Sequence, residues 1–133
     1  MMLKLLPVVL VIGLSIHGLI HLMGFVAYWP LKDVPELAYK TAFLGGRLEF
    51  GANGTRLFSL LWLLAAIGFI VAGIALVSEW SWGVPVLVLV TLLSLVITAL
   101  DWEPAFRGTL INGVILAVLL LAPHFARLLP QTN

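Results

Sequence analysis

The stretch LLPVVLVIGLSIHGLIHLMGFVAYW, residues 5–29, decides the fold class because it is almost entirely apolar. An α-helix rises ~1.5 Å per residue, so a run of this length can cross a hydrocarbon layer of ~30 Å. The only side chains in it that titrate near neutral pH are His17 and His21. Imidazoles are costly to place in lipid, and we therefore expect them to face other helices or a cavity.

The composition of the whole chain agrees with a membrane location. Of 133 residues, 62% are hydrophobic and 10% are charged, whereas soluble domains carry roughly 25% charged residues. These values predict a single integral membrane domain over residues 1–133. The net charge of +1 argues against a nucleic-acid partner, which would need a concentrated basic face. The absence of cysteine excludes disulfides and cysteine-based metal sites.

Four apolar segments predict an all-α bundle of four transmembrane helices, at about residues 5–29, 55–77, 84–102 and 108–129. The residue before a proline avoids the helical region, so Trp29-Pro30 ends the first segment and Glu103-Pro104 separates the last two. The first segment is too long for the apolar part of a signal peptide and no cleavage motif follows it, which favours a retained span. Aromatic residues that suit a membrane interface flank the segments: Tyr28, Trp29 and Trp102 at one end, Trp80 and Trp82 at the other.

The first loop carries signals that are typical of a helix. Asp33 is a good N-cap, Pro35 suits a first turn and Glu36 follows three residues after the cap. The glycine pair Gly45-Gly46 is a typical helix end. We therefore expect a short amphipathic helix at about residues 34–44, lying on the membrane surface.

Lysine and arginine predict the orientation. The first and third loops carry more of them than the other side of the membrane, with Lys32, Lys40, Arg47, Arg56 and Arg107 against Lys4 and Arg127. The positive-inside rule then places loops 1 and 3 in the cytoplasm and both termini outside. The expected location is a cytoplasmic membrane.

Polar residues gather on single faces of the predicted helices. At ~100° per residue, one arc of ~80° on the first span holds Gly13, His17, His21, Gly24 and Tyr28. A similar arc on the third span holds Thr91, Ser94, Thr98 and Asp101. Both arcs carry their polar groups toward the end of the bundle that loops 1 and 3 form.

This convergence predicts a polar pocket inside the membrane. Its expected ligand-binding residues are His17, His21, Ser94, Asp101, Arg107 and Asn112. The same hydroxyl and amide groups also suit a purely structural role as hydrogen bonds between helices. In that interpretation Asp101 and Arg107 form an interfacial ion pair that closes the third loop.

The two histidines do not define a cofactor. Side chains at positions i and i+4 can share one metal ion, but a metal site needs further ligands and none is expected at this depth, so no metal site is predicted. Both imidazoles share one face of one helix, so they cannot ligate the two faces of one haem. The cofactor is therefore left open.

Three functions fit these residues. The first is a small binding or accessory protein whose polar pocket takes a lipid-soluble ligand. The second is a membrane-embedded enzyme that acts on a lipid-like substrate, with His21 as general base and Asp101 orienting it. The third is a structural subunit of a larger complex. The expected partners are the lipid bilayer, a lipid-soluble small molecule, and further copies of the chain or other membrane subunits.

Two short motifs resemble a known group of proteins. The segment HGLIHLMGF, residues 17–25, and the D-x5-R-G-T-x2-N run from Asp101 to Asn112 resemble those of small four-span bacterial membrane proteins. The layout is also similar, at the level of architecture, to that of DoxX-like membrane proteins. The resemblance implies a four-span fold in a bacterial cytoplasmic membrane, and it directs attention to the residues that helical geometry selects.

Overall fold

The computed structural model describes residues 2–128 of the chain, and the side chains of residues 8–124. It contains four long helices, α1 (Met2–Tyr28), α2 (Gly51–Val77), α3 (Gly83–Leu100) and α4 (Trp102–Leu128). Each is long and apolar enough to cross a membrane. The predicted all-α four-span architecture is thus confirmed, and the protein is an integral membrane protein. The predicted end of the fourth span, residue 129, lies outside the described residues.

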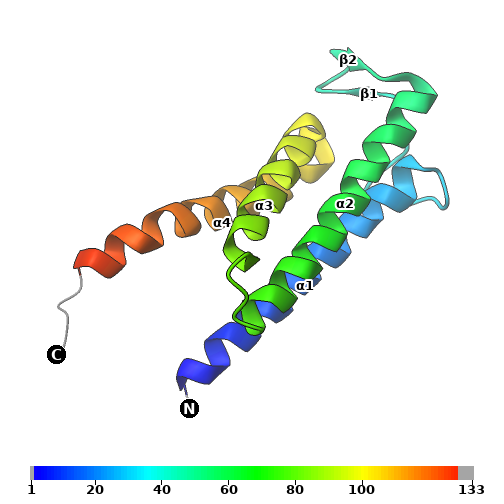
Figure 1. Cartoon of the computed structure of the whole chain (residues 1–133). Helices are drawn as coiled ribbons and strands as arrows, with labels where there is room; N and C mark the ends of the chain where they lie inside the picture. Colours follow the sequence, from blue (N-terminus) through cyan, green and yellow to red (C-terminus); the bar gives the residue numbers. More distant parts are fainter. Residues whose placement is uncertain (1, 129–133) are drawn as a thin grey trace.

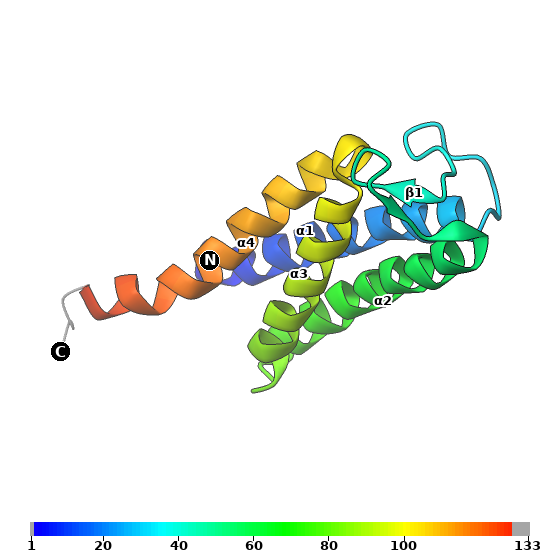
Figure 2. The ribbon, with the colours of Figure 1, turned by 90° about the horizontal axis from the view of Figure 1, so that it is seen from above.

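The helices pack in the order of the sequence. The antiparallel pair of α1 and α2 forms one layer, α3 packs against α2, and α4 packs against α3 (Figures 1 and 2). The C-terminal half of α4 leaves the other helices (Figure 1), and none of the residues 113–124 is buried. The fourth helix is therefore held to the rest of the protein mainly by its N-terminal half.

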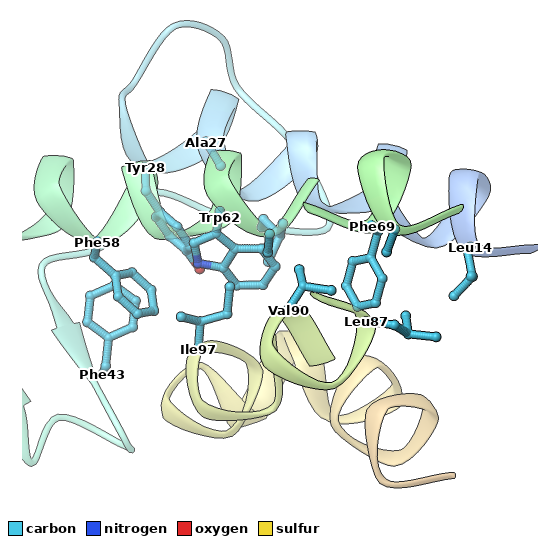
Figure 3. Close-up of a cluster of buried hydrophobic side chains, with 13 residues drawn as sticks. Leu14, Ala27, Tyr28, Phe43, Phe58, Trp62, Phe69, Leu87, Val90 and Ile97 are labelled. Carbon is cyan, nitrogen blue, oxygen red and sulfur yellow. The ribbon is translucent and has the colours of Figure 1, made fainter. Parts of the chain in front are cut away.

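The core lies between α1, α2 and α3 and is rich in aromatic residues (Figure 3). Trp62 and Phe69 of α2 are buried there with Ile97 of α3. Apolar side chains on the outer faces remain exposed, for example Leu89 at 66% and Val114 at 63%. An apolar exterior around a partly polar interior is what a lipid environment favours, because lipid gives buried polar groups no hydrogen-bond partners.

The helix expected at residues 34–44 is not formed. This part of loop 1 is irregular, and it ends in a hairpin of β1 (Ala42–Phe43) and β2 (Leu48–Glu49). The glycine pair makes the hairpin turn instead of a helix end, since Leu44, Gly45 and Gly46 all have positive φ, at 51°, 62° and 85°. Glycine adopts this region without steric cost, whether the turn follows a helix or a strand.

The hairpin is pinned to the bundle by Phe43. Its side chain is fully buried, and its ring centroid lies 4.6 Å from that of Phe58 and 5.4 Å from that of Tyr28. The backbone N–H of Leu44 also donates to the carbonyl of Leu100, at 3.1 Å. The strand β1 buries Phe43, and Leu44 at the turn that follows is 38% exposed.

The junction between α3 and α4 is shorter than the sequence predicts. Asp101 alone separates the two helices, and the expected break at Glu103-Pro104 lies within the first turn of α4. Proline is well tolerated there, because the N–H it lacks would have no partner inside the helix. This early start lets Asn112 reach α3 and α1.

Glycine permits two close approaches. A Cβ atom on Gly24 of α1 would lie 2.2 Å from the ring of Trp62, and one on Gly68 of α2 would lie 2.5 Å from Val90. Gly13, expected on the inward face of α1, is instead exposed, and a Cβ atom there would meet nothing within 4 Å.

These two glycines of α1 provide a matched test of the packing. We expect Gly24→Ala to lower the free energy of unfolding by ~1–3 kcal/mol, because Trp62 must move to make room. Gly13→Ala should change it by no more than ~1 kcal/mol, and in the stabilising direction, because alanine favours a helix. Thermal unfolding of both variants in the same detergent measures the difference. Equal stability of the two variants would contradict the packing of Trp62 on α1.

Candidate functional site

A chain of hydrogen bonds joins α1, α3 and α4 inside the bundle. Nε2 of His17 lies 3.0 Å from Oδ1 of Asn112, and Nδ2 of Asn112 donates to Oγ of Ser94 at 2.6 Å. Oγ of Ser94 lies 2.6 Å from Nε2 of His21, whose Nδ1 lies 2.8 Å from the backbone carbonyl of His17. We call His17, His21, Ser94 and Asn112 the histidine network.

The direction of every bond in the histidine network follows from chemistry. A carbonyl only accepts, so Nδ1 of His21 carries a proton and donates to His17. Nε2 of neutral His21 then accepts from the hydroxyl of Ser94, which itself accepts from Asn112. The amide oxygen of Asn112 therefore accepts from Nε2–H of His17. This assignment leaves one ring nitrogen without a partner among residues 8–124, Nδ1 of His17.

Aromatic rings of α2 enclose the two imidazoles. The ring centroids of His17 and His21 lie 4.8 Å apart, in an edge-on arrangement. Phe69 lies 4.7 Å from His17 and Trp62 lies 5.4 Å from His21. These contacts hold the imidazoles in a fixed orientation, and they shield the hydrogen bonds from the opposite side.

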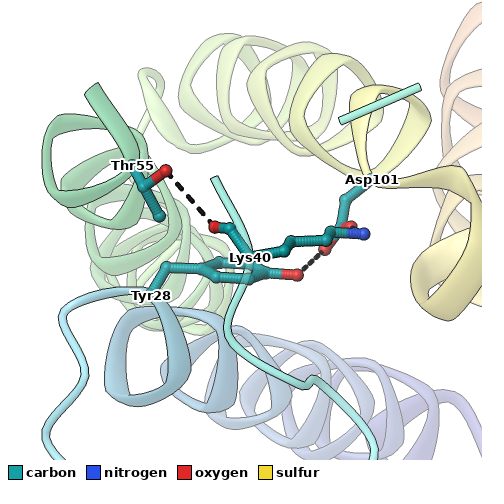
Figure 4. Close-up of polar contacts among 4 residues, drawn as sticks. All are labelled: Tyr28, Lys40, Thr55 and Asp101. Carbon is teal, nitrogen blue, oxygen red and sulfur yellow. Dashed lines mark hydrogen bonds and ion pairs between the residues drawn. The ribbon is translucent and has the colours of Figure 1, made fainter. Parts of the chain in front are cut away.

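A second polar cluster lies at the loop end of the bundle (Figure 4). The hydroxyl of Tyr28 donates to Oδ2 of Asp101, and Nζ of Lys40 lies 2.5 Å from Oδ1 of the same carboxylate. Tyr28 and Asp101 are fully buried. Burial raises the pKa of the Asp101 carboxyl above its usual value, and Lys40 and Tyr28 act in the opposite direction. We call these three residues the loop clamp.

The loop clamp fixes loop 1 to three helices at once. Lys40 belongs to loop 1, Tyr28 ends α1 and Asp101 follows α3. The hydroxyl of Thr55 in α2 donates to the backbone carbonyl of Lys40, at 3.3 Å, as Figure 4 shows. The N–H of Phe50 donates to the carbonyl of Thr41, at 2.8 Å. The position of loop 1 over the bundle therefore depends on an ion pair between a buried carboxylate and a half-buried lysine, and on backbone contacts around it.

A cavity of about 380 Å³ opens beside the histidine network. Side chains of α1, α2, α3 and α4 line it together with loop 1: His17, Ile20, His21, Met23, Glu36, Leu37, Trp62, Thr98, Pro104, Ala105, Arg107, Gly108 and Ile111. Glu36 and Arg107 supply its charged groups, and the indole N–H of Trp62 is buried without a hydrogen-bond partner. The cavity has the size of a small-molecule pocket and a few polar groups in an apolar wall.

The structure divides the six predicted site residues into three groups. His17, His21 and Arg107 line the cavity. Ser94 and Asn112 are fully buried behind it, where they bond the histidines. The ion pair of Asp101 with Arg107, which the purely structural interpretation suggested, is not formed, because Asp101 binds Lys40 and Tyr28. Because α4 already begins at Trp102, Arg107 lies one to two turns inside the helix and not at its start. Its side chain is exposed there.

The geometry also limits the chemistry of the histidines. Both ring nitrogens of His21 are engaged, and among residues 8–124 no hydrogen bond joins His21 to Asp101. His21 is therefore not placed as a general base that Asp101 orients. Within the described part of the chain, no group of three or more His, Asp or Glu side chains is close enough to hold a metal ion.

Sequence reasoning missed three residues that the structure brings to this end of the bundle. The sequence contained a hint for two of them. Tyr28 shares the polar arc of α1, and Trp62 lies near the loop end of its span. Tyr28 was expected at the membrane interface and is fully buried. Nothing in the sequence indicated the role of Lys40, because its partner depends on the path of loop 1.

Comparison with protein-family models, with curated proteins and with solved structures found no match.

The loop clamp predicts that the free energy of unfolding depends strongly on the balance of charge between Lys40 and Asp101. We expect Lys40→Met to lower the free energy of unfolding by about 3 kcal/mol, because it leaves the buried Asp101 carboxylate without its cation. Adding Asp101→Asn should restore much of this loss, since the uncompensated charge is then gone. Chemical unfolding of both single variants and the double variant gives the coupling energy. Additive effects of the two substitutions would contradict a buried ion pair.

Proposed function

We propose that the protein binds the head group of a lipid-soluble amphiphile in the cavity beside the histidine network. The single observation that carries this proposal is the position of the cavity. It lies at the depth of His17 and His21, inside a membrane bundle, with apolar walls and few polar groups. The protein is then a binding or accessory protein of the membrane.

The lining of the cavity supports a ligand that enters from the lipid. Ile20 of α1 and Ile111 of α4 line it, and they are 50% and 47% exposed. The gap between α1 and α4 thus opens toward the acyl chains. An amphiphile can leave its tail there and place its head group against the histidines.

Polar atoms in the wall supply the affinity for a head group. The imidazoles of His17 and His21 line the cavity, and an imidazole can take part in hydrogen bonds with a polar head group. Arg107 adds a guanidinium at the mouth of the cavity, and guanidinium groups bind polar oxygens well.

A substitution that fills the cavity tests the proposal. Ile111→Trp places a large ring at the cavity wall, whereas Leu110→Trp places the same ring on an exposed position, 59% accessible, that does not line the cavity. Native mass spectrometry of gently extracted protein should show a bound amphiphile on the wild type and on Leu110→Trp. We expect Ile111→Trp to lose most of it.

Two results would contradict the proposed function. One is a bare wild-type protomer after gentle extraction from its own membrane, with no mass added on titration with amphiphiles. The other is an equal bound mass on both tryptophan variants. In either case the polar residues serve to pack the helices, as in a structural subunit.

We also propose that the cavity end faces the cytoplasm of a bacterial cell. The basic residues of the first and third loops support this orientation through the positive-inside rule. Because the chain has no cysteine, single cysteines at Gly46 and Ser81 give a clean test. We expect a membrane-impermeant thiol reagent to label Ser81→Cys in intact cells, and Gly46→Cys only after lysis. The reverse pattern would overturn the orientation.

A further inference from the structure

One ring nitrogen of the histidine network, Nδ1 of His17, has no hydrogen-bond partner among residues 8–124, and its chemistry indicates which class of ligand the cavity binds. Nε2–H of His17 donates to Asn112. Nδ1 of the neutral ring therefore carries a lone pair, which has no partner within this part of the chain. His17 lines the cavity and retains 7% of its exposure, whereas His21 retains 1%. The imidazole that the cavity can reach is thus the one with a free acceptor.

Asn112 takes the one N–H of neutral His17, so this ring has no donor left for a ligand in the cavity. The amide nitrogen of Asn112 is engaged with Ser94 and Thr98, which fixes its oxygen toward His17. Rotation of the amide would place its N–H groups against Nε2 and would break both of these bonds. The second nitrogen of His17 therefore stays an acceptor as long as the network is intact.

Other polar groups of the wall do not duplicate this role. The hydroxyl of Thr98 donates to the carbonyl of Ser94 at 2.7 Å and its oxygen already accepts from Nδ2 of Asn112 at 3.4 Å. The indole N–H of Trp62 and the guanidinium of Arg107 are donors only. The carboxylate of Glu36 accepts, but it belongs to loop 1 at the mouth. His17 is the acceptor at membrane depth among the described residues that line the cavity.

We infer that the cavity selects an amphiphile whose head group donates a hydrogen bond, a lipid-soluble alcohol or phenol, by accepting its O–H at Nδ1 of His17. This inference rests on the proposed function and names the ligand class. An ether or ester of the same shape has no O–H to give. It would leave Nδ1 unpaired, and a site built for a hydroxyl discriminates strongly against an analogue that lacks one.

The test uses two probes of nearly equal size, decanol and decyl methyl ether. The protein is labelled with ¹⁵N-histidine and with ¹³C-methyl methionine and studied by NMR in detergent micelles. Met23 lines the cavity, so its methyl resonance reports occupancy by either probe. The chain has three histidines, and His124, which is exposed on α4, is an internal control.

We expect both probes to shift the methyl resonance of Met23. Decanol alone should shift the unprotonated ring nitrogen of His17, in the direction that an acceptor nitrogen shows when it gains a hydrogen bond. The resonances of His21 and His124 should stay in place. Decanol should also bind more tightly than the ether, as read from the Met23 titration.

A variant separates recognition from folding. In His17→Gln, the side-chain amide lies near the former Nε2 and can still donate to Asn112, but nothing remains at the position of Nδ1. We expect this variant to fold, to bind both probes and to lose the preference for decanol.

Each other outcome has a defined meaning. If neither probe shifts Met23, the cavity does not bind amphiphiles and the proposed function fails. If both shift Met23 equally and the nitrogen of His17 does not respond, the proposed function stands and the selection of a hydroxyl is wrong. A protonated Nδ1 in the free protein, or a retained preference in His17→Gln, would also overturn the selection.

Discussion

The structure depends on satisfying polar groups where lipid offers no hydrogen-bond partner. Inside a bilayer each unpaired polar group costs free energy, so a polar side chain is tolerated only where another helix completes it. Among residues 8–124, the histidine network meets this condition at three of its four ring nitrogens, all but Nδ1 of His17, with one side-chain amide and one hydroxyl between two imidazoles. Because α1 and α4 do not otherwise pack closely, the bond from His17 to Asn112 ties the first helix to the last. The cavity lies along that weakly packed seam.

The loop clamp solves the same problem at the membrane surface by a different means. A buried carboxylate is stable only with a cation and further donors, and Asp101 receives Lys40 and Tyr28. This arrangement requires that loop 1 take one path, irregular at Lys40 and anchored by Phe43. The benefit is that Glu36 and Leu37, which precede Lys40 in the same loop, are held over the cavity.

The sequence predicts the parts of this arrangement that follow from helical periodicity. The polar arcs of α1 and α3 predicted that His21 and Ser94 face other helices, and the hydrogen bond between them agrees with this. Loop 1 has no period, and its helix signals at Asp33 and Gly45-Gly46 are local. Tertiary contacts overrode them, since Phe43 is buried from a β-strand and Lys40 pairs with Asp101 from an irregular segment. The partner of Asp101 could not be predicted before the path of loop 1 was known.

A structural role and a binding role of the histidines differ in how many ring nitrogens must have a hydrogen-bond partner within the protein. This difference distinguishes the two interpretations. Helix packing alone needs each imidazole to be satisfied, and His21 meets that demand with both ring nitrogens bonded. His17 does not, because one of its nitrogens is left without a partner among residues 8–124 beside a cavity. A residue chosen only to join α1 to α4 could have been an amide of similar length, which leaves no ring nitrogen at the cavity. The asymmetry between the two histidines is therefore the feature that a purely structural role does not account for.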